Sequence, residues 1–388
     1  MVETSKRRLF LFSIPIQNRF KLQKIKQMNI FSGIITRGIA VANWAVVVLM
    51  MITGYAYFFS PIQHSLMSAT GVLFPVFLVL NTLFLVFWVV VKFKYSYIPI
   101  LGFVLCYTPT HQYAPLNIEK EAPKGSLKVL SYNIQSYGYL PGDTTRDEEN
   151  PIVQYIANSK ADIVCLQEAP KARIEHEVVT TLNPIYPYQS EMVHETSGDV
   201  LTLYSKYPII STERIPFDSE VNLSVAYRIK VGKDTVLVVN NHLESNNMTN
   251  ADKAGFKNIV QGNITKKETK QESSLLLNKL AIAAKKRAVQ VEAVANVLKK
   301  YQHLPQIVCG DFNEWPNGYA LNTLQKTLTN SFVESGNGPG WSYHRSGMYV
   351  RIDNILCSKE FKPYGAIVDS SIDLSDHYPI YCYLERTK

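Results

Sequence analysis

Two long apolar stretches lie close together in the first quarter of the chain. Residues 38–59 and 69–91 are both uncharged, and each is long enough to cross the ~30 Å hydrocarbon core of a bilayer as a helix. Pro75 and Asn81 lie within the second stretch, which a helix tolerates when it packs against neighbours. Only the short polar segment 60–68 separates the two stretches. The pattern therefore predicts two transmembrane helices rather than a pair of buried helices in a globular domain.

A third apolar run covers residues 97–107 and is short for a membrane span. With its flanks, from residue 95 to residue 113, it reaches the length that a thin or locally thinned bilayer requires. An interfacial segment is the alternative. We expect a third span here, and the choice matters because it decides on which side of the membrane the rest of the chain lies.

Basic residues around these stretches predict their orientation. Several precede the first span, with Arg37 at its edge, whereas residues 60–68 carry none and Lys92 and Lys94 follow the second span. By the positive-inside rule, the N-terminus lies in the cytoplasm of this integral membrane protein. Three spans then place the chain beyond Tyr113 on the outer, periplasmic side of the cytoplasmic membrane. Two spans leave it in the cytoplasm.

Beyond residue 113 the pattern changes to short apolar runs between polar loops. Strands are predicted at residues 127–134, 161–169, 199–210, 224–231, 234–243, 306–313, 350–358 and 375–385. Helices are predicted at 151–160 and at 274–301, where apolar residues recur three and four positions apart. Strands mixed with a few helices over this length predict a layered α/β sandwich.

The chain is thus expected to have four parts. They are a basic cytoplasmic N-terminus (1–37), an all-α transmembrane region of two or three helices (38–113), a linker (114–126) and a large α/β domain (127–388). The linker is assigned from its prolines, its glycine and its mixed charge.

Composition sharpens this picture in two places. Charged residues make up 19 % of the chain, below the typical ~25 % of soluble domains, because Glu3 is the sole acid among the first 115 residues. The net charge of +8 comes from the N-terminal stretch and from a second basic cluster between Lys253 and Arg287. That cluster is either a solvated surface or a site of attraction for anionic phosphate or lipid headgroups. The five cysteines show no metal-ligand spacing, and three of them lie in apolar runs typical of small buried hydrophobes.

The candidate chemistry lies where the apolar strands end or begin. Each of several strands is bounded by side chains of metal-ligand or proton-transfer type: Asn133, Glu168, His242, Asp311, Asn313, Asp353, Asp376 and His377. Strand ends in a sandwich can converge on one edge. Carboxylate and amide oxygens suit Mg²⁺ or Mn²⁺, and two histidines suit charge stabilisation and proton transfer at a phosphate.

Taken singly, these residues say little. A glutamate at a strand end is usually a solvated residue, and a GDFN sequence is more often a turn with an Asx cap. Asp353 is less ordinary, because a carboxylate between Ile352 and Ile355 is expected to be part-buried and to need a partner.

The ordered set of motifs is more specific. In sequence order, SYNIQSYG, DIVCLQE, SKYPI, NHL, GDFN, RIDNI and SDHYPI resemble the endonuclease/exonuclease/phosphatase superfamily, over residues 127–388. This superfamily includes pancreatic-type DNases, abasic-site endonucleases, neutral sphingomyelinases and inositol polyphosphate phosphatases. The hydrophobic spans before the domain also look like those of a group of bacterial membrane proteins in this superfamily. The resemblance implies a four-layered, DNase-like α/β sandwich and a divalent-metal-dependent hydrolase.

The resemblance also implies roles for the matching residues. Glu168 would be the principal metal ligand, with Asn133 and Asp376 helping to hold the metal and its waters. Asp311 would orient or deprotonate the attacking water, and Asn313 would bind a phosphate oxygen.

The two histidines complete the implied site. His377 would face the scissile phosphate, with Asp353 hydrogen-bonded to its other ring nitrogen. His242 would stabilise the phosphate or protonate the leaving group. An Asp353–His377 pair would raise the pKa of the imidazole and fix its tautomer.

The substrate stays open at this point. A membrane tether favours a phospholipid headgroup, which it would meet at high effective concentration, whereas the second basic cluster favours a nucleic-acid backbone. The sequences CGDFNEWP and YVRIDNIL depart from the pattern of the inositol phosphatases. The expected function is hydrolysis of a phosphodiester by metal-assisted in-line attack of water. A phosphomonoesterase acting on a sugar or inositol phosphate, and a non-catalytic membrane scaffold, are the alternatives. The oligomeric state is not predicted.

Overall fold

The computed structural model describes residues 16–138, 149–246, 248–249, 252, 254, 266–345 and 347–387, with side chains from residue 31 and, in the helix that begins at Lys266, from residue 274. The chain divides into two compact units. One contains the residues up to Met51 together with Val76–Cys106, and the other contains Ile52–Pro75 together with Tyr107 onwards. Residues 52–75 therefore belong to the same unit as the strands, although the sequence pattern grouped them with the transmembrane region.

Three helices make up most of the first unit: α2 (Ile16–Gly54), α4 (Phe74–Val91) and α5 (Tyr97–Leu105). By length and composition alone, two helical stretches are long and apolar enough to cross a membrane, Phe31–Phe58 and Pro61–Val91. The stretch Phe93–Leu105 is apolar but shorter.

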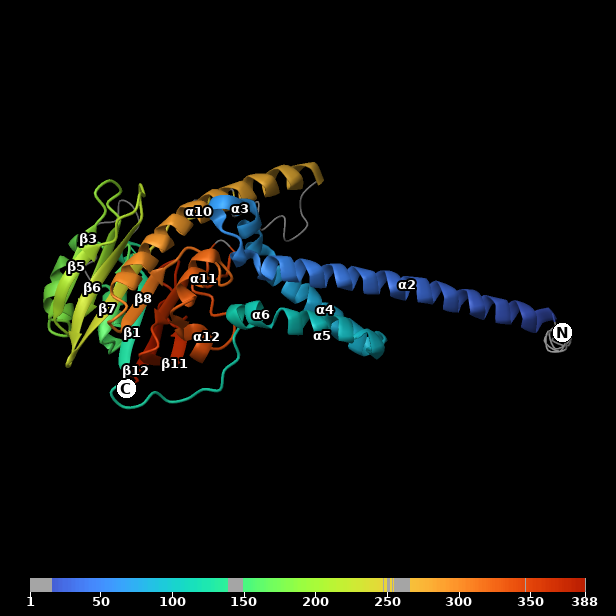
Figure 1. Cartoon of the computed structure of the whole chain (residues 1–388), viewed down its shortest axis with the longest axis horizontal. Coiled ribbons are helices and arrows are strands. Elements are labelled where there is room, and N and C mark those ends of the chain that lie inside the picture. The colour runs from blue at the N-terminus through green and yellow to red at the C-terminus, as the bar shows by residue number, and fades with distance from the viewer. Residues whose placement is uncertain are drawn as a thin grey trace. The chain divides into compact units, whose positions relative to one another are not determined.

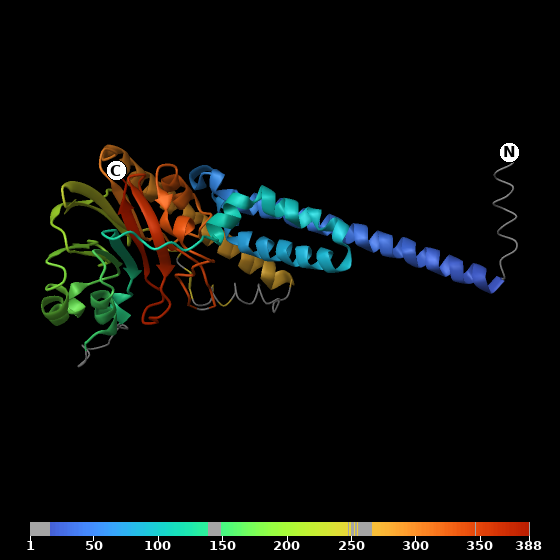
Figure 2. The same cartoon turned by 90° about the horizontal axis from the view of Figure 1, so that it is seen from below.

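Polar contacts join these helices within the first unit. The indole Nε1 of Trp88 donates to Asn43 Oδ1 at 3.0 Å, and Asn81 Nδ2 donates to the carbonyl of Pro99 at 3.0 Å, so α4 lies beside both α2 and α5 (Figure 2). Gly102 allows this approach, because a Cβ there would lie 3.0 Å from the Asn81 amide. Asn81 is thus buried beside a neighbouring helix, the setting in which a polar residue within an apolar helix is tolerated.

The second unit contains two six-stranded sheets among its described residues (Figure 1). The first sheet has the order β11 (Phe361–Val368), β12 (Ile380–Arg386), β1 (Leu127–Asn133), β2 (Ile163–Gln167), β4 (Val200–Ser205) and β3 (Tyr188–Val193). The second has the order β5 (Ile209–Arg214), β6 (Leu223–Val231), β7 (Asp234–His242), β8 (Gln306–Asp311), β10 (Asp353–Cys357) and β9 (Thr329–Asn330). β1 pairs parallel with β2, and β7 pairs parallel with β8, while the other neighbouring strands are antiparallel.

The helices of the second unit are α3 (Pro61–Ala69), α6 (Tyr107–Tyr113), α7 (Pro151–Asn158), α8 (Glu175–Glu177), α10 (Lys266–Lys300), α11 (Tyr319–Gln325) and α12 (Ser331–Ser335). Of these, α7 covers the outer face of the first sheet and α10 and α11 cover that of the second, whereas α3 packs against α10 and Phe332 of α12 lies in the core between the sheets. Short turns of other helix types are η1 (Ala56–Phe58), η2 (Thr70–Leu73), η4 (Ser136–Gly138), η5 (Lys171–Arg173) and η6 (Val178–Leu182), and η3 (Phe93–Tyr95) lies in the first unit.

The alternation of side chains along each strand builds the layers. In β1, Val129 packs between the two sheets, whereas Leu130 packs outward in the cluster that contains residues of α7. In β8, Ile307 packs between the sheets and Val308 packs outward against residues of α10 and α11. The result is helices, sheet, sheet and helices, which confirms the predicted four-layered α/β sandwich. All five cysteines are buried and free, as small hydrophobes would be.

A buried pair of amides fixes the two sheets against each other. Gln167 Nε2, at the end of β2, donates to Asn240 Oδ1 on β7 at 2.6 Å, and Asn240 Nδ2 donates to the carbonyl of Leu166 at 3.0 Å. Buried polar groups of this kind are paired in stable structures. Because the pair lies close to the ends of both strands, it brings those ends to the same edge of the sandwich.

Two predicted strands have different bounds in the structure. The segment 199–210 forms β4 and β5, which lie in different sheets, because the chain turns at Tyr207 and Pro208. The last strand, predicted from residue 375, begins only at Ile380. Asp376 and His377 therefore lie in the loop before β12 rather than in the strand.

Candidate active site

Four candidate residues lie at the carboxyl ends of the two parallel strand pairs. Asn133 is the last residue of β1, and Glu168 directly follows β2, whose Gln167 is opposite Asn133. His242 ends β7, and Asp311 ends β8 directly opposite it. Since the ends of parallel strands meet at one edge of a sheet, register alone places each pair together.

β10 adds a fifth residue from the opposite direction. Asp353 is its first residue, and antiparallel pairing sets it opposite Asp311. The edge thus receives Asn133 and Glu168 from the first sheet and three residues from the second.

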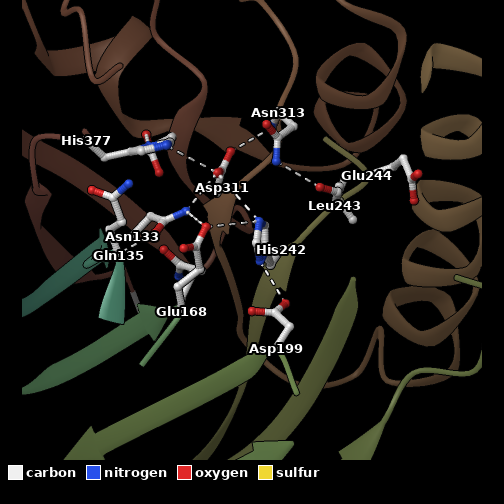
Figure 3. A network of polar contacts seen from close by, with 12 residues as sticks. Asn133, Gln135, Glu168, Asp199, His242, Leu243, Glu244, Asp311, Asn313 and His377 are labelled. Carbon is white, nitrogen blue, oxygen red and sulfur yellow. Dashed lines mark hydrogen bonds and ion pairs between the residues drawn. The ribbon is translucent and has the colours of Figure 1, made fainter. Parts of the chain in front are cut away.

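Asp311 lies at the centre of the resulting network (Figure 3). It is 1 % exposed, and its Oδ2 accepts a hydrogen bond from Asn133 Nδ2 at 3.1 Å. The Nε2 atoms of His377 and His242 lie 3.6 Å and 3.9 Å from the same oxygen. Its other oxygen accepts from the backbone N–H of Asn313 at 2.8 Å.

Each histidine is backed by its own carboxylate. His377 Nδ1 lies 2.7 Å from Asp353 Oδ2, the contact that the family resemblance implied. His242 Nδ1 lies 2.8 Å from Asp199 Oδ2, a partner that the sequence reasoning missed. Its signal was an acid at the first position of the apolar run 199–205. The Nε2 atom of each ring is left to face Asp311.

These carboxylates set the charge of the rings. Burial alone lowers the pKa of His242, but the charge and hydrogen bond of Asp199 outweigh it and raise the pKa to about 10. Burial likewise opposes the charging of His377, yet Asp353 and Asp311 raise its pKa well above the usual value. For Asp311, burial raises the pKa and the imidazoliums counteract it, leaving a pKa of about 6. Both rings are therefore held in the protonated form, and their charges counter the effect of burial on Asp311.

Backbone conformation helps to aim three of the site residues. Glu168 and Asn313 adopt left-handed φ angles of +53° and +51°. Such angles cost a residue other than glycine roughly 1–2 kcal/mol, and they gather at functional sites. Gly310, at φ +132°, precedes Asp311, and a Cβ there would lie 2.0 Å from the carbonyl oxygen of Asn241. Only glycine lets β7 and β8 approach so closely beside the site.

Asn313 still has a hydrogen to offer. Its Nδ2 donates to the carbonyl of Leu243 at 2.9 Å, which uses one of the two amide hydrogens. The other is available for an acceptor such as a phosphate oxygen.

The loop before β12 is held by Ser375. Its Oγ donates to the carbonyl of Asn133 at 2.7 Å and accepts from the backbone N–H of His377 at 3.2 Å. Asp376 lies between these residues in sequence and is half-buried, with Oδ1 3.5 Å from Ser375 Oγ. The structure thus joins seven of the eight candidates in direct contacts and places Asp376 beside them, where its charge contributes to the raised pKa of His377.

The second basic cluster does not form a continuous cationic surface in its described part. Arg287 is fully buried, with Nη1 donating to the Glu244 carbonyl and to Asn246 Oδ1, both at 2.9 Å, and Nε 3.7 Å from Glu314 Oε1. Lys286 pairs with Glu244 at 2.8 Å. The interpretation of Arg287 as a phosphate-tracking residue was therefore wrong, because a guanidinium inside the fold cannot reach a polymer. Other members lie outside the described residues or side chains: Lys253, Lys257, Lys266, Lys267 and Lys270.

Comparison with protein-family models gives a match over residues 130–377, well over half of the chain, to the Endonuclease/Exonuclease/phosphatase family. The chain belongs to this family. Residues 36–113 match a Domain of unknown function (DUF8431). A comparison with curated proteins found no match.

Several solved structures are similar in fold. The human Nocturnin catalytic domain with bound sulfate is 15 % identical, with a TM-score of 0.49 over 70 % of this chain and 97 % of that one. An endonuclease/exonuclease/phosphatase family protein from Bacteroides thetaiotaomicron is 17 % identical, with a TM-score of 0.45 over 67 % and 97 %. D. rerio TDP2 complexed with single strand DNA product is 14 % identical, with a TM-score of 0.47 over 68 % and 100 %.

Family membership makes metal-dependent hydrolysis of phosphate esters the general activity of this fold. The donor set fits such a metal, because hard divalent cations prefer oxygen ligands with room for water. The side chain of Glu168 is 38 % exposed, and its Oε1 accepts a hydrogen bond from Asn133 Nδ2 at 3.1 Å. Asn133 thus points its amide nitrogen at Glu168. To share a metal with Glu168, the Asn133 amide would have to rotate so that its oxygen, instead of its nitrogen, lies on the side of Glu168.

A second acidic group lies deeper in the site. Ligand atoms of Asp311, Asp353 and His377 lie within 4.8 Å of one another, and all three residues are buried. Asp353 and one nitrogen of His377 already bind each other, so this group suits a proton network better than a cation. The partly exposed carboxylate of Glu168 is the better candidate to hold a cation.

Proposed function

We propose that this protein is a membrane-anchored phosphodiesterase that uses Mg²⁺ or Mn²⁺ and acts on a lipid headgroup. The observation that supports the activity is the pair of carboxylate-backed imidazoliums that face Asp311 beside Glu168. A phosphodiester anion repels an incoming oxygen nucleophile, so the site has to neutralise charge before water can attack.

The residues divide the work as follows. A cation held by Glu168, with Asn133 and Asp376, would withdraw charge from the phosphate oxygens and the leaving oxygen. Asp311, whose carboxylate form the two imidazoliums stabilise against burial, orients the attacking water and accepts its proton. The free amide hydrogen of Asn313 binds a phosphate oxygen.

The imidazoliums complete the charge balance. His377, held in orientation by Asp353, donates from Nε2 to the phosphate as water attacks opposite the leaving group. His242, held by Asp199, supports the phosphate or gives its proton to the leaving oxygen.

The division into units supports an outer location for the site. The chain leaves the second unit after Pro75 and returns at Tyr107. Residues 52–75 and the strands are parts of one compact unit, which cannot lie on both sides of a bilayer. If the first unit lies in the membrane, residues 76–106 enter it and return to the same side, with α4 and α5 as the second and third spans. With a cytoplasmic N-terminus, the catalytic unit is then periplasmic.

Sidedness has a direct test. Protease added to intact spheroplasts should digest the catalytic unit of the full chain, while a cytoplasmic marker stays whole. Protection of the unit until the membrane is ruptured would contradict the outer location.

A lipid headgroup is the preferred substrate for two reasons. The apolar helices would hold the site where headgroups are concentrated. In addition, Arg287 and Lys286, which suggested a nucleic-acid track, are bound to groups within the protein.

The activity is tested with the purified full chain in lipid nanodiscs. The panel contains sphingomyelin, phosphoinositides, plasmid DNA, RNA and a bis-aryl phosphate, each with Mg²⁺, Mn²⁺ or a chelator. We expect metal-dependent release of a phosphorylated headgroup, lowered by orders of magnitude in His377→Ala. Cleavage of DNA or RNA alone would make the protein a nuclease, release from phosphomonoesters alone a phosphomonoesterase, and no turnover at all a scaffold.

A further inference from the structure

Two stretches of the second unit flank residues 76–106 in sequence. They are residues 52–75 and 107–113, and we call them the collar. Both contact residues 311–317, which comprise the last residue of β8, Asp311, and the loop after it with Asn313, and which are called here the catalytic loop.

Gln112 makes the most specific of these contacts. Its side chain is buried, and its Nε2 donates to the carbonyl of Pro316 and to Gln325 Oε1, both at 2.6 Å. Its own carbonyl accepts from Nη2 of Arg351, a fully buried side chain whose Nη1 donates to the Pro339 carbonyl at 2.8 Å. One collar residue is therefore bonded both to the catalytic loop and to a residue two positions before Asp353.

The other collar segment meets the same loop independently. Ala69 is buried with Trp315, Leu280 and Ala281 in one apolar cluster. Gly71 lies so close that a Cβ on it would be 3.0 Å from the indole Nε1 of Trp315. The catalytic loop thus packs against both stretches of the collar.

These contacts continue to the reacting groups. Within the catalytic loop, the N–H of Asn313 bonds Asp311 Oδ1 at 2.8 Å, and the N–H of Phe312 bonds the carbonyl of Ile352, next to Asp353, at 3.0 Å. Displacement of Pro316 or of Arg351 would therefore move Asn313, Asp311 or Asp353.

We propose that Gln112 is a positioning residue for phosphoester hydrolysis, which ties the collar to the catalytic loop and to β10 and so keeps Asp311, Asn313 and Asp353 in register. This inference rests on the proposed function. It also means that the chain from residue 127 onwards lacks the collar contacts that hold the catalytic residues in register.

The test uses Gln112→Glu in the full chain in nanodiscs. This substitution keeps the size of the side chain but turns its two N–H donors into an acceptor that faces two other acceptors. We expect kcat to fall on the order of 10²-fold, since misplacement of catalytic groups from a distance has effects of that size, while KM changes little. Adding Gln325→Lys, which supplies a positive partner for the new carboxylate, should recover much of kcat.

Gln306→Glu is the matched control. Gln306 is also a buried glutamine whose Nε2 donates to two acceptors, the carbonyls of Leu298 at 2.7 Å and Tyr301 at 3.0 Å. It lies at the opposite end of β8 from the site. We expect this variant to lower the melting temperature but to keep the wild-type kcat, so an equal loss of kcat in both variants would reduce Gln112 to a structural role and overturn the proposal.

Amide hydrogen exchange separates this inference from the function itself. In Gln112→Glu, exchange should quicken in residues 311–317 and 353–357, and in Gln306→Glu it should not. If the wild type hydrolysed no phosphodiester, the proposed function would fail, but hydrogen exchange would still test whether Gln112 holds the catalytic loop and β10 in place. Unchanged exchange of residues 311–317 and 353–357 in Gln112→Glu would overturn that inference. Should Gln112→Glu not fold, Gln325→Ala removes one of the two acceptors and should produce the same exchange pattern more weakly.

Discussion

The two sheets meet at the site but contribute different chemistry. The first sheet offers Asn133 and the partly exposed Glu168, whose oxygens suit a hydrated cation. The second offers His242, Asp311 and Asp353, which are buried and bound to one another or to further charges. The proton network also draws on the first sheet, because Asp199 directly precedes β4 and His377 lies in the loop before β12.

This difference predicts different responses to substitution. An open carboxylate contributes little to folding, so its loss should change activity alone. A buried charge whose partner is removed is left uncompensated, which costs several kcal/mol in typical proteins. Substitution of the partly exposed Glu168 should therefore separate activity from stability, and substitutions in the buried network should not.

The largest loss of stability is expected at Gly310, where β7 and β8 of the second sheet approach too closely for a side chain. Gly310→Ala would place a Cβ 2.0 Å from the Asn241 carbonyl at a φ of +132°. We expect it to lower the melting temperature by about 10 °C or more, or to prevent folding, because overpacking and backbone strain add. Gly365→Ala is the control, since its φ is also positive, at +52°, but its Cβ would lie 3.7 Å from Tyr383. Similar losses in both variants would show that φ rather than the close approach decides.

Glu168→Gln tests whether activity can be lost without stability at the partly exposed carboxylate that follows β2 of the first sheet. Removing the charge that would hold the cation should reduce kcat on the order of 10³-fold, the equivalent of several kcal/mol of charge stabilisation. The melting temperature should hardly move, because the side chain is 38 % exposed. Rates and thermal unfolding are measured on the same preparation. Residual activity of a tenth or more would argue against Glu168 as the principal ligand.

Asp199→Asn tests the proton network through pH. The pKa of His242 in the folded protein, about 10, lies above the ~6.5 of an unfolded chain, so its bound proton stabilises the fold fully below that lower value. This contribution is lost as the pH rises through about 10. The wild type should therefore lose melting temperature between these two pH values, with a chelator present throughout, and the variant should lose less. Parallel curves for the two proteins would mean that Asp199 does not hold the proton on His242.

Lys286→Ala should have the smallest effect. The lysine is 49 % exposed and pairs at 2.8 Å with the buried Glu244, whose other oxygen still accepts from Ser219 Oγ at 3.2 Å, so the carboxylate keeps one partner and kcat should not change. Affinity for DNA, measured by fluorescence anisotropy, should not change either, in contrast to what a phosphate-tracking lysine would show. Lys285→Ala, in the exposed lysine next to it in the same cluster, should leave the affinity for DNA unchanged as well, and a loss of affinity in either variant would support phosphate tracking.

Most of the strands could be predicted because their apolar positions alternate or run together. β3 could not, because its residues YQSEMV are half-exposed or exposed at the edge of a sheet and carry little apolar signal. β11 contains Pro363 and Gly365, two residues that normally argue against a strand interior. The turn between β4 and β5 was also missed, because the run 199–210 reads as one apolar stretch although its halves belong to different sheets.

The site could be predicted to the extent that its residues stand at strand ends and in recurring motifs. The contact of Asp353 with His377 followed from the family resemblance. Asp199 did not, because 43 residues separate it from His242 and the two meet only through the packing of one sheet against the other. Arg287 was misjudged for the same reason, since the charge of a residue does not reveal which face of a helix is buried.

Local patterns along the chain determine which segments are apolar helices, which are strands, and which polar residues end them, since side-chain periodicity depends only on near neighbours. The tertiary structure decided which carboxylate backs which imidazole, and that residues 52–75 and 107–113 belong with the sandwich rather than with the first unit. Those choices depend on contacts such as that of Gln112 with Pro316, 204 positions apart, for which no nearby residue carries a signal.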